Sequence, residues 1–141
     1  MHGKFAGRCH CESLGYVYRT DIAPQMWAIR ACQCSFCRAH DALSTSDPAG
    51  TIEFFANDDA ALQKYRFAMR TGDFLLCKRC GMYAGAVLDT NHGQFGIINL
   101  RLLQKIPARM PNVVAVSYAR ESAAGRVSRR EERWTPVNAV P

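Results

Sequence analysis

The sequence predicts a mostly β fold, and two observations carry this prediction. Short apolar stretches rich in β-branched and aromatic residues recur along the chain, each bounded by turn-forming residues. Seven cysteines fall into three groups, and two of these groups follow a predicted strand directly. Closely spaced thiols at strand ends are typical of metal-binding knuckles. We therefore expect small antiparallel sheets held together by bound zinc, with one or two short helices.

The first half of the chain contains three expected strands, at residues 14–20, 26–31 and 51–56, and one expected helix. Residues 14–20 alternate apolar and other side chains, and residues 51–56 are β-prone after a Pro-Gly-containing turn. A short apolar run at residues 26–31 leads into Cys32, which places the central cysteine group in a loop. A short helix is expected over residues 57–65, because Asn57 can cap it and the acidic residues that follow suit a helix N-terminus.

The second half is expected to continue as strands and to end in a helix. The expected strands lie at residues 74–76, 82–88 and 95–103, with polar turns at 71–73 and 89–93 and a last extended segment at 113–116. Residues 117–134 are charged and predict an amphipathic helix, although Gly125 in its middle costs about 1 kcal/mol relative to Ala.

Length and composition indicate one cytoplasmic domain. A chain of 141 residues with 48% hydrophobic residues can bury a single core. It contains no run of about 18 apolar residues and no N-terminal pattern of a signal peptide, so neither a membrane span nor secretion is expected. In the cytosol, an odd number of cysteines favours metal binding over a disulfide framework.

The positive charge is concentrated near the C-terminus. Residues 104–141 contain seven Lys or Arg against three Asp or Glu, whereas residues 1–103 contain 11 against nine. We expect residues 1–103 to form the zinc-binding domain and residues 104–141 to form a basic extension packed on it or trailing from it. The extension is expected to be a solvated surface outside the chemistry, with at most weak, salt-sensitive binding of nucleic acid.

The spacing of the cysteines predicts one closed and one open metal site. Cys9, Cys11, Cys77 and Cys80 form two pairs, and four thiolates complete a tetrahedral structural zinc site. Soft sulfur ligands favour zinc over calcium or magnesium. The remaining thiols form the motif C-x-C-x-x-C, and they are Cys32, Cys34 and Cys37.

Three thiolates leave one of the four coordination positions of zinc open, and an open position is typical of a catalytic site. An incoming thiol would lose its proton there and become a nucleophile at neutral pH. His40 lies three residues after Cys37 and is the alternative fourth ligand, which would make the site purely structural. His10, between two expected ligands, is expected to face solvent, and His92 in a turn is given no role.

These three cysteine motifs resemble one family. They are Gly7-Arg8-Cys9-His10-Cys11, Cys32-Gln33-Cys34-Ser35-Phe36-Cys37-Arg38 and Cys77-Lys78-Arg79-Cys80-Gly81. In this order they are similar to the glutathione-dependent formaldehyde-activating enzyme family, which includes S-(hydroxymethyl)glutathione synthase and proteins similar to centromere protein V. The resemblance covers residues 5–103 and all seven cysteines. The family usually has Gly directly after the first C-x-C, where this chain has Glu12.

The resemblance implies an Mss4-like fold with two zinc ions per chain. It implies that Cys9, Cys11, Cys77 and Cys80 hold the structural zinc, and that Cys32, Cys34 and Cys37 hold a catalytic zinc that receives the thiol of glutathione. The expected activity is that of a carbon–sulfur lyase, which condenses glutathione or a similar thiol with formaldehyde or a related small aldehyde. Two alternatives stay open, namely a non-catalytic zinc-dependent thiol carrier or sensor, and a zinc-built interaction module with a basic tail.

Overall fold

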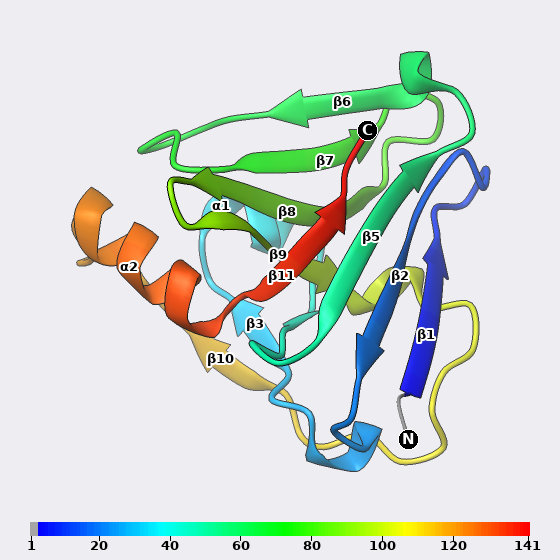
Figure 1. Cartoon of the computed structure of the whole chain (residues 1–141), viewed down its shortest axis with the longest axis horizontal. Coiled ribbons are helices and arrows are strands. Elements are labelled where there is room, and N and C mark those ends of the chain that lie inside the picture. Colours follow the sequence, from blue (N-terminus) through cyan, green and yellow to red (C-terminus); the bar gives the residue numbers. More distant parts are fainter. Residues whose placement is uncertain (1–2) are drawn as a thin grey trace.

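The computed structural model describes residues 3–141, and β-strands dominate it (Figure 1). The strands are β1 (Gly3–Arg8), β2 (Leu14–Thr20), β3 (Arg30–Cys32), β4 (Ser44–Thr45), β5 (Thr51–Ala56), β6 (Leu62–Tyr65), β7 (Asp73–Cys77), β8 (Tyr83–Thr90), β9 (Gly93–Asn99), β10 (Val114–Val116) and β11 (Thr135–Ala139). The helices are α1 (Ser35–Ala39) and α2 (Ala123–Arg133), with short 3₁₀ turns η1 (Pro24–Met26), η2 (Asp59–Ala61) and η3 (Leu100–Leu102). The predicted mostly β fold with two helices is confirmed.

The strands join into one mixed sheet that branches at β9. The main path runs in the order β1-β2-β5-β11-β9-β4-β3-β10, and a branch leads from β9 through β8 and β7 to β6. Most pairs are antiparallel, as expected, but β10 pairs with β3 and β11 with β5 in parallel. Connected strands, rather than separate small sheets, therefore hold the two halves of the chain together.

The strands predicted from alternating apolar residues are present. Residues 14–20 and 51–56 form β2 and β5 with the predicted bounds, and they pair with each other. Leu14, Tyr16 and Tyr18 are fully buried on the inner face of β2, as their alternation requires. The expected strand at 95–103 starts as β9 but ends at Asn99, where the η3 turn begins.

The expected helix over residues 57–65 was wrong. Asp58 caps a single 3₁₀ turn by accepting a hydrogen bond from the Ala60 amide at 3.0 Å, and the chain then extends as β6. β6 pairs along its whole length with β7. The inter-strand hydrogen bonds of that pairing outweigh the weak helical preference of a segment this short.

The segment after residue 103 lies within the sheet. β11 runs between β5 and β9, as the red strand in Figure 1 shows, and β10 extends the opposite end through β3. The hydroxyl of Thr135, on β11, accepts a hydrogen bond at 2.7 Å from the buried amide of Asp47. No strand was predicted at 135–139, but these residues form β11, which pairs with β9 at Thr135 and Pro136 and with β5 from Val137 onward.

Asn99 joins three elements at the centre of the molecule. Its side-chain amide donates to the Tyr83 carbonyl at 2.8 Å, and its side-chain oxygen accepts from the Leu43 amide at 3.3 Å. Its own carbonyl accepts a hydrogen bond from the Tyr16 hydroxyl at 2.8 Å. Asn99, Tyr83 and Tyr16 are buried, so their polar groups depend on these protein partners, while Leu43 is partly exposed.

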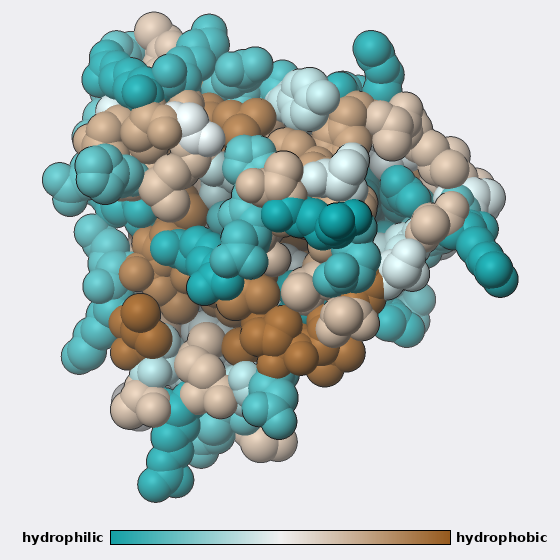
Figure 2. All heavy atoms as spheres, turned by 180° about the vertical axis from the view of Figure 1, so that it is seen from behind, coloured by the Kyte–Doolittle hydropathy of each residue, from teal (hydrophilic) through white to brown (hydrophobic). Residues whose placement is uncertain are grey.

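The surface combines polar and apolar areas. On the face turned away from the view of Figure 1, hydrophobic atoms gather in patches with hydrophilic atoms between them (Figure 2). Exposed apolar side chains include Ile106, which precedes β10, and Val114, which lies on β10. Across residues 3–141, no helix has the length and apolar character that crossing a membrane demands.

The Asn99 network predicts a large loss of stability on truncation. We expect Asn99→Ala to lower the free energy of unfolding by about 2–4 kcal/mol, because the Tyr83 carbonyl and the Leu43 amide would lose their partners. Chemical denaturation measures this change. Gln94→Ala, on the same strand but partly exposed, is the control and should change stability by about 0.5 kcal/mol or less. Equal effects of the two substitutions would contradict the role given to Asn99.

Candidate metal centres

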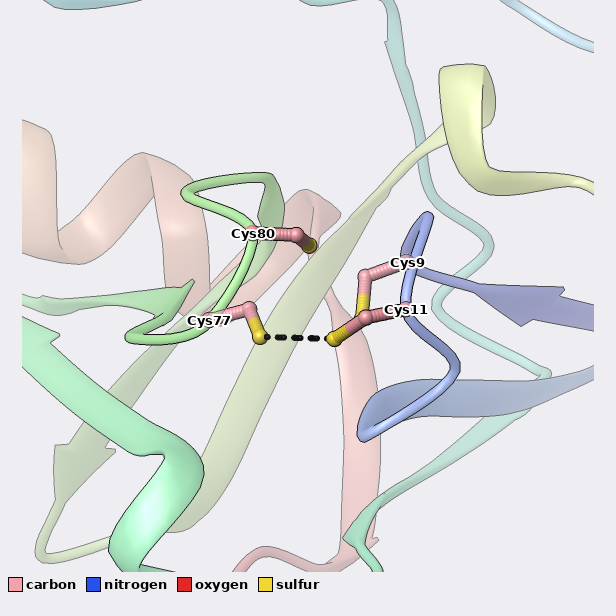
Figure 3. A group of neighbouring side chains, drawn as sticks. All are labelled: Cys9, Cys11, Cys77 and Cys80. Atoms are coloured by element: carbon pink, nitrogen blue, oxygen red, sulfur yellow. Dashed lines mark hydrogen bonds between the residues drawn. The ribbon is translucent and has the colours of Figure 1, made fainter.

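The structure brings the two outer cysteine pairs together. Cys9 and Cys11 lie in the turn between β1 and β2, while Cys77 ends β7 and Cys80 lies in the turn before β8. In Figure 3 the four side chains point toward one another from these two turns. Their sulfur atoms all lie within 4.8 Å of one another, with 3.7 Å between Cys9 and Cys11 and 3.5 Å between Cys11 and Cys77.

These distances suit a tetrahedral metal site. Zinc–sulfur bonds of about 2.3 Å in a tetrahedron place the sulfur atoms about 3.8 Å apart. The observed separations of 3.7 and 3.5 Å are close to that edge length, so this group can hold a metal ion of zinc's size and ligand preference. The group also joins residues that are 66 positions apart in the sequence.

Both cysteine turns have the same local shape. The residue after the second cysteine has a positive φ in each case, 81° at Gly81 and 66° at Glu12. Gly81 adopts this conformation at no steric cost, whereas Glu12 has the conformation for which glycine is favoured. The Glu12 carbonyl accepts hydrogen bonds from Arg8 at 3.0 Å and from Asn57 at 3.2 Å, which hold the strained turn in place.

The protonation of the four thiols is uneven. Burial raises the pKa of Cys9 to about 12, while hydrogen bonding with the Ser13 side chain lowers the pKa of Cys11 to about 6. The Leu14 amide donates a hydrogen bond to the Cys9 sulfur at 3.3 Å, a contact of the kind that supports metal-bound thiolates. A metal ion at the centre would take the place of the protons that the thiols otherwise share.

The central cysteine group forms a second cluster. Cys32 is the last residue of β3, Cys34 caps the N-terminus of α1, and Cys37 lies within α1. Their sulfur atoms lie within 4.8 Å of one another. The sequence analysis had placed all three in a loop, which was wrong. The Cys37 amide donates to the Cys34 sulfur at 3.4 Å, and this capping bond starts the short helix.

Electrostatics within the three-thiol cluster favour one thiolate. Hydrogen bonding with the Cys37 thiol lowers the pKa of Cys32 to about 5, with a smaller contribution from the positive charge of Arg129. The same hydrogen bond raises the pKa of Cys37, and burial adds to this increase. The cluster therefore holds a negative charge readily, as metal ligation requires.

The expected histidine candidates lie outside both clusters. Within residues 3–141, the second group contains only the three cysteines, and the His40 ring packs against Phe36 with their centroids 4.5 Å apart. His10 is exposed, as expected. His92 pairs with Glu131 on the surface and belongs to neither cysteine cluster.

A cavity of about 330 Å³ opens beside the three-thiol cluster. Cys32, Cys34 and Cys37 all line it, whereas none of the other four cysteines does. Other parts of the wall come from residues 116–119, next to Cys32 through the pairing of β10 with β3, and from α2; they contribute Tyr118 and three arginines. The C-terminal segment, which was expected to take no part in the chemistry, therefore lines the cavity beside the three thiols, because β10 and β11 pair within the sheet.

Two buried side chains in the cavity wall each have one polar atom without a hydrogen-bond partner among residues 3–141. Among residues 3–141, neither the Tyr83 hydroxyl nor the Arg130 Nε atom has a hydrogen-bond partner. Burial raises the pKa of Tyr83 well above its usual value, so the phenol keeps its proton. Burial also lowers the pKa of Arg130 to about 10, which leaves the guanidinium charged at neutral pH. The sequence analysis missed both residues, because the sequence around a single Tyr or Arg does not show which of its polar atoms lack hydrogen-bond partners in the fold.

The arginines of α2 have further contacts at the mouth of the cavity. Arg129 forms two hydrogen bonds to the Glu121 carboxylate, at 2.8 and 3.1 Å, and its guanidinium lies 3.6 Å from the centre of the Tyr118 ring. Arg126 also contacts Glu121, at 3.4 Å. These pairs lower the pKa of Glu121, so its carboxylate is ionised at neutral pH.

Comparison with known proteins supports the fold alone. No protein-family model matches the chain, and no curated protein matches it. Among solved structures it is similar to a structural-genomics protein from Rhodobacter sphaeroides, with a TM-score of 0.57 and 21% sequence identity over 77% of this chain and 99% of that one. At this identity the likeness is one of chain topology and carries no activity.

The two clusters should differ in their importance for folding. We expect Cys77→Ser to lower the melting temperature strongly or prevent folding, because a structural zinc site contributes about 10–16 kcal/mol in small peptides and here joins distant segments. Cys34→Ser removes a ligand from a group that lies within six residues, and it should leave a folded protein. Differential scanning fluorimetry and elemental analysis measure both effects, with about two zinc ions expected for wild type and about one for Cys34→Ser. A soluble Cys77→Ser protein with an unchanged melting temperature would argue against this division.

Proposed function

We propose that the protein is a zinc-dependent enzyme that joins glutathione, or a similar thiol, to formaldehyde or a related small aldehyde. In this proposal it is a cytoplasmic carbon–sulfur lyase of the S-(hydroxymethyl)glutathione synthase kind, with an Mss4-like fold. Cys9, Cys11, Cys77 and Cys80 hold a structural zinc ion, and Cys32, Cys34 and Cys37 hold the zinc ion at which the thiol binds. The family assignment rests on the order and spacing of the cysteine motifs.

The observation that carries the proposal is the placement of the three-thiol cluster in a cavity. A cluster with only three ligands needs a fourth, and a cavity of about 330 Å³ beside it has room for a small molecule. The four-thiol cluster has a complete set of ligands, and Cys9 alone of its members lines the more open hollow beside it, which suits a structural role. A bound zinc ion supplies a position for the thiol and a lower thiol pKa, so that the sulfur is a thiolate at neutral pH.

The chain itself supplies a hydrogen-bond donor for the reaction. Addition joins the thiol sulfur to the aldehyde carbon, and the carbonyl oxygen gains negative charge and then a proton. Tyr83 lines the cavity, keeps its proton, and has a hydroxyl without a partner among residues 3–141. We assign Tyr83 the role of donating a hydrogen bond to that oxygen as its charge develops.

The carrier alternative uses the same cavity without catalysis. Because the uncatalysed addition of thiols to formaldehyde is itself easy, binding of the thiol does not by itself establish an enzyme. The interaction-module alternative is less favoured, because Arg126, Arg129 and Arg130 of the basic segment face the cavity rather than a continuous outer surface. Measurement of binding and of rate in the same sample separates the enzyme from the carrier.

Thiol binding should depend on the free thiol and on pH. We expect glutathione to bind the zinc-loaded protein, and S-methylglutathione to bind at least about tenfold more weakly, because it has no thiol proton to lose. Affinity should rise from about pH 6 to pH 8, since metal coordination competes with protonation of the incoming thiol. Isothermal titration calorimetry measures these affinities, and Cys34→Ser should abolish the difference between the two ligands.

The rate of adduct formation tests catalysis directly. Exchange NMR of formaldehyde with glutathione should show faster interconversion with the protein than without it, after subtraction of the spontaneous reaction. Equal binding of glutathione and S-methylglutathione at every pH would place the sulfur away from the metal. Normal binding with no increase in the exchange rate would replace the enzyme by the carrier.

Tyr83 allows a sharper test of the mechanism. We expect Tyr83→Phe to lower the catalysed exchange rate about 100-fold, within the range of a positioned proton donor, and to leave glutathione affinity within about twofold. Stability should be preserved, since the lost hydroxyl forms no hydrogen bond within residues 3–141. Tyr18→Phe is the matched control, because Tyr18 is also fully buried but does not line the cavity, and its exchange rate should equal that of wild type. Full activity of Tyr83→Phe would remove the tyrosine from the mechanism.

A further inference from the structure

The cavity next to the three thiols is strongly positive. Its wall contains four arginines, Arg30, Arg126, Arg129 and Arg130, and no Asp or Glu among the described residues. Glu121 approaches Arg126 and Arg129 from outside the wall and offers them a single negative charge. Arg30 donates a hydrogen bond at 2.8 Å to the neutral hydroxyl of Ser46. The positive charge of this wall is therefore only partly balanced by the protein.

Arg130 is the most deeply buried of these arginines. It is 7% exposed, and within residues 3–141 it forms no salt bridge. Its Nη1 atom donates to the Thr71 hydroxyl at 3.0 Å, its guanidinium lies 4.5 Å from the centre of the Trp134 ring, and its Nε atom has no partner. Trp134 and Thr71 hold the guanidinium plane in one orientation. A buried guanidinium that is held in one orientation and has a donor without a partner is suited to bind an anion.

The positive charges around Arg130 also favour a bound anion. Burial is the main cause of the lowered pKa of Arg130, and the positive charges of Arg129 and Arg126 lower it further. A buried cation among other cations is costly unless an anion shares the site. A planar guanidinium presents paired donors that match the two oxygen atoms of a carboxylate.

We propose that Arg130 and the neighbouring arginines of α2 form an anion subsite, so that the thiol that binds beside Cys32, Cys34 and Cys37 carries a carboxylate. This inference rests on the proposed function and specifies its substrate class. The sulfur lies at the three cysteines and the carboxylate at the arginines of α2, which line the same cavity. Arg130 is then a specificity-determining residue, which selects acidic thiols over neutral thiols of the same size.

The test compares two thiols that differ only in charge. 3-Mercaptopropionate carries a carboxylate, and 3-mercaptopropionamide is a neutral thiol of nearly the same shape. Calorimetric titration of the zinc-loaded, full-length protein should give a dissociation constant at least about tenfold lower for the carboxylate, as expected for one charge-assisted pair. This comparison on the wild-type protein requires no variant to fold.

A variant then assigns the preference to Arg130. Arg130→Met should reduce the preference to about twofold or less and change the affinity for the amide by no more than about twofold. Arg109→Met, at an exposed arginine outside the cavity, is the matched control and should keep the full preference.

The failures of the two proposals are distinguishable. If neither thiol binds, the proposed function fails and the anion subsite fails with it. If both thiols bind equally to wild type, the proposed function stands and the anion subsite is overturned. If Arg130→Met weakens the binding of both thiols equally, the arginine balances the charge of the thiolate cluster instead, and the specificity role is overturned.

Discussion

The convergence of four thiols on one point is the constraint on which the rest of the structure depends. Cys9 and Cys11 come from the hairpin of β1 and β2, and Cys77 and Cys80 come from the hairpin of β7 and β8. In both hairpins the residue directly after the second cysteine has a positive φ. A metal ion held by these thiols would join the first two strands to the branch of the sheet that carries Phe74 and Tyr83 of the cavity wall.

The two thiol clusters show how one type of ligand can serve two purposes. In the first, the thiols come from segments distant in the sequence, so a metal ion held there would contribute to folding. In the second, the ligands come from six consecutive residues and can approach the centre from one side only. The other side is open to a cavity, and the chemistry there depends on what the facing wall provides.

The facing wall comes from the segment whose charge is most positive. Sheet pairing of β11 with β5 and β9 anchors the end of α2, and the helix then presents arginines to the cavity. An arginine-rich helix on an outer surface is typical of nucleic-acid contacts, whereas the same residues inside a small cavity suit a small anion. Position, rather than composition, therefore decides which partner this charge can bind.

The sequence by itself determined the strands with clear alternation and the division of the cysteines. Residues 14–20 and 51–56 were predictable because one buried face imposes a period of two, and the cysteine groups because metal ligands need close spacing. The helix expected at 57–65 failed because pairing with β7, a contact distant in sequence, outweighed a local cap. β11 was missed for the same reason, since only its neighbours β5 and β9 make it a strand.

Only the tertiary structure decided what faces the three thiols. Tyr83, Arg130 and the cysteines lie on separate elements, and no local pattern relates them. Their meeting results from the long-range pairing of β8, β10 and β11. The Tyr83 hydroxyl and the Arg130 Nε atom lack partners among residues 3–141, which can be recognised only when every neighbour is known. Local sequence encodes ligand spacing and strand period, whereas burial and unmet hydrogen bonds are properties of the assembled fold.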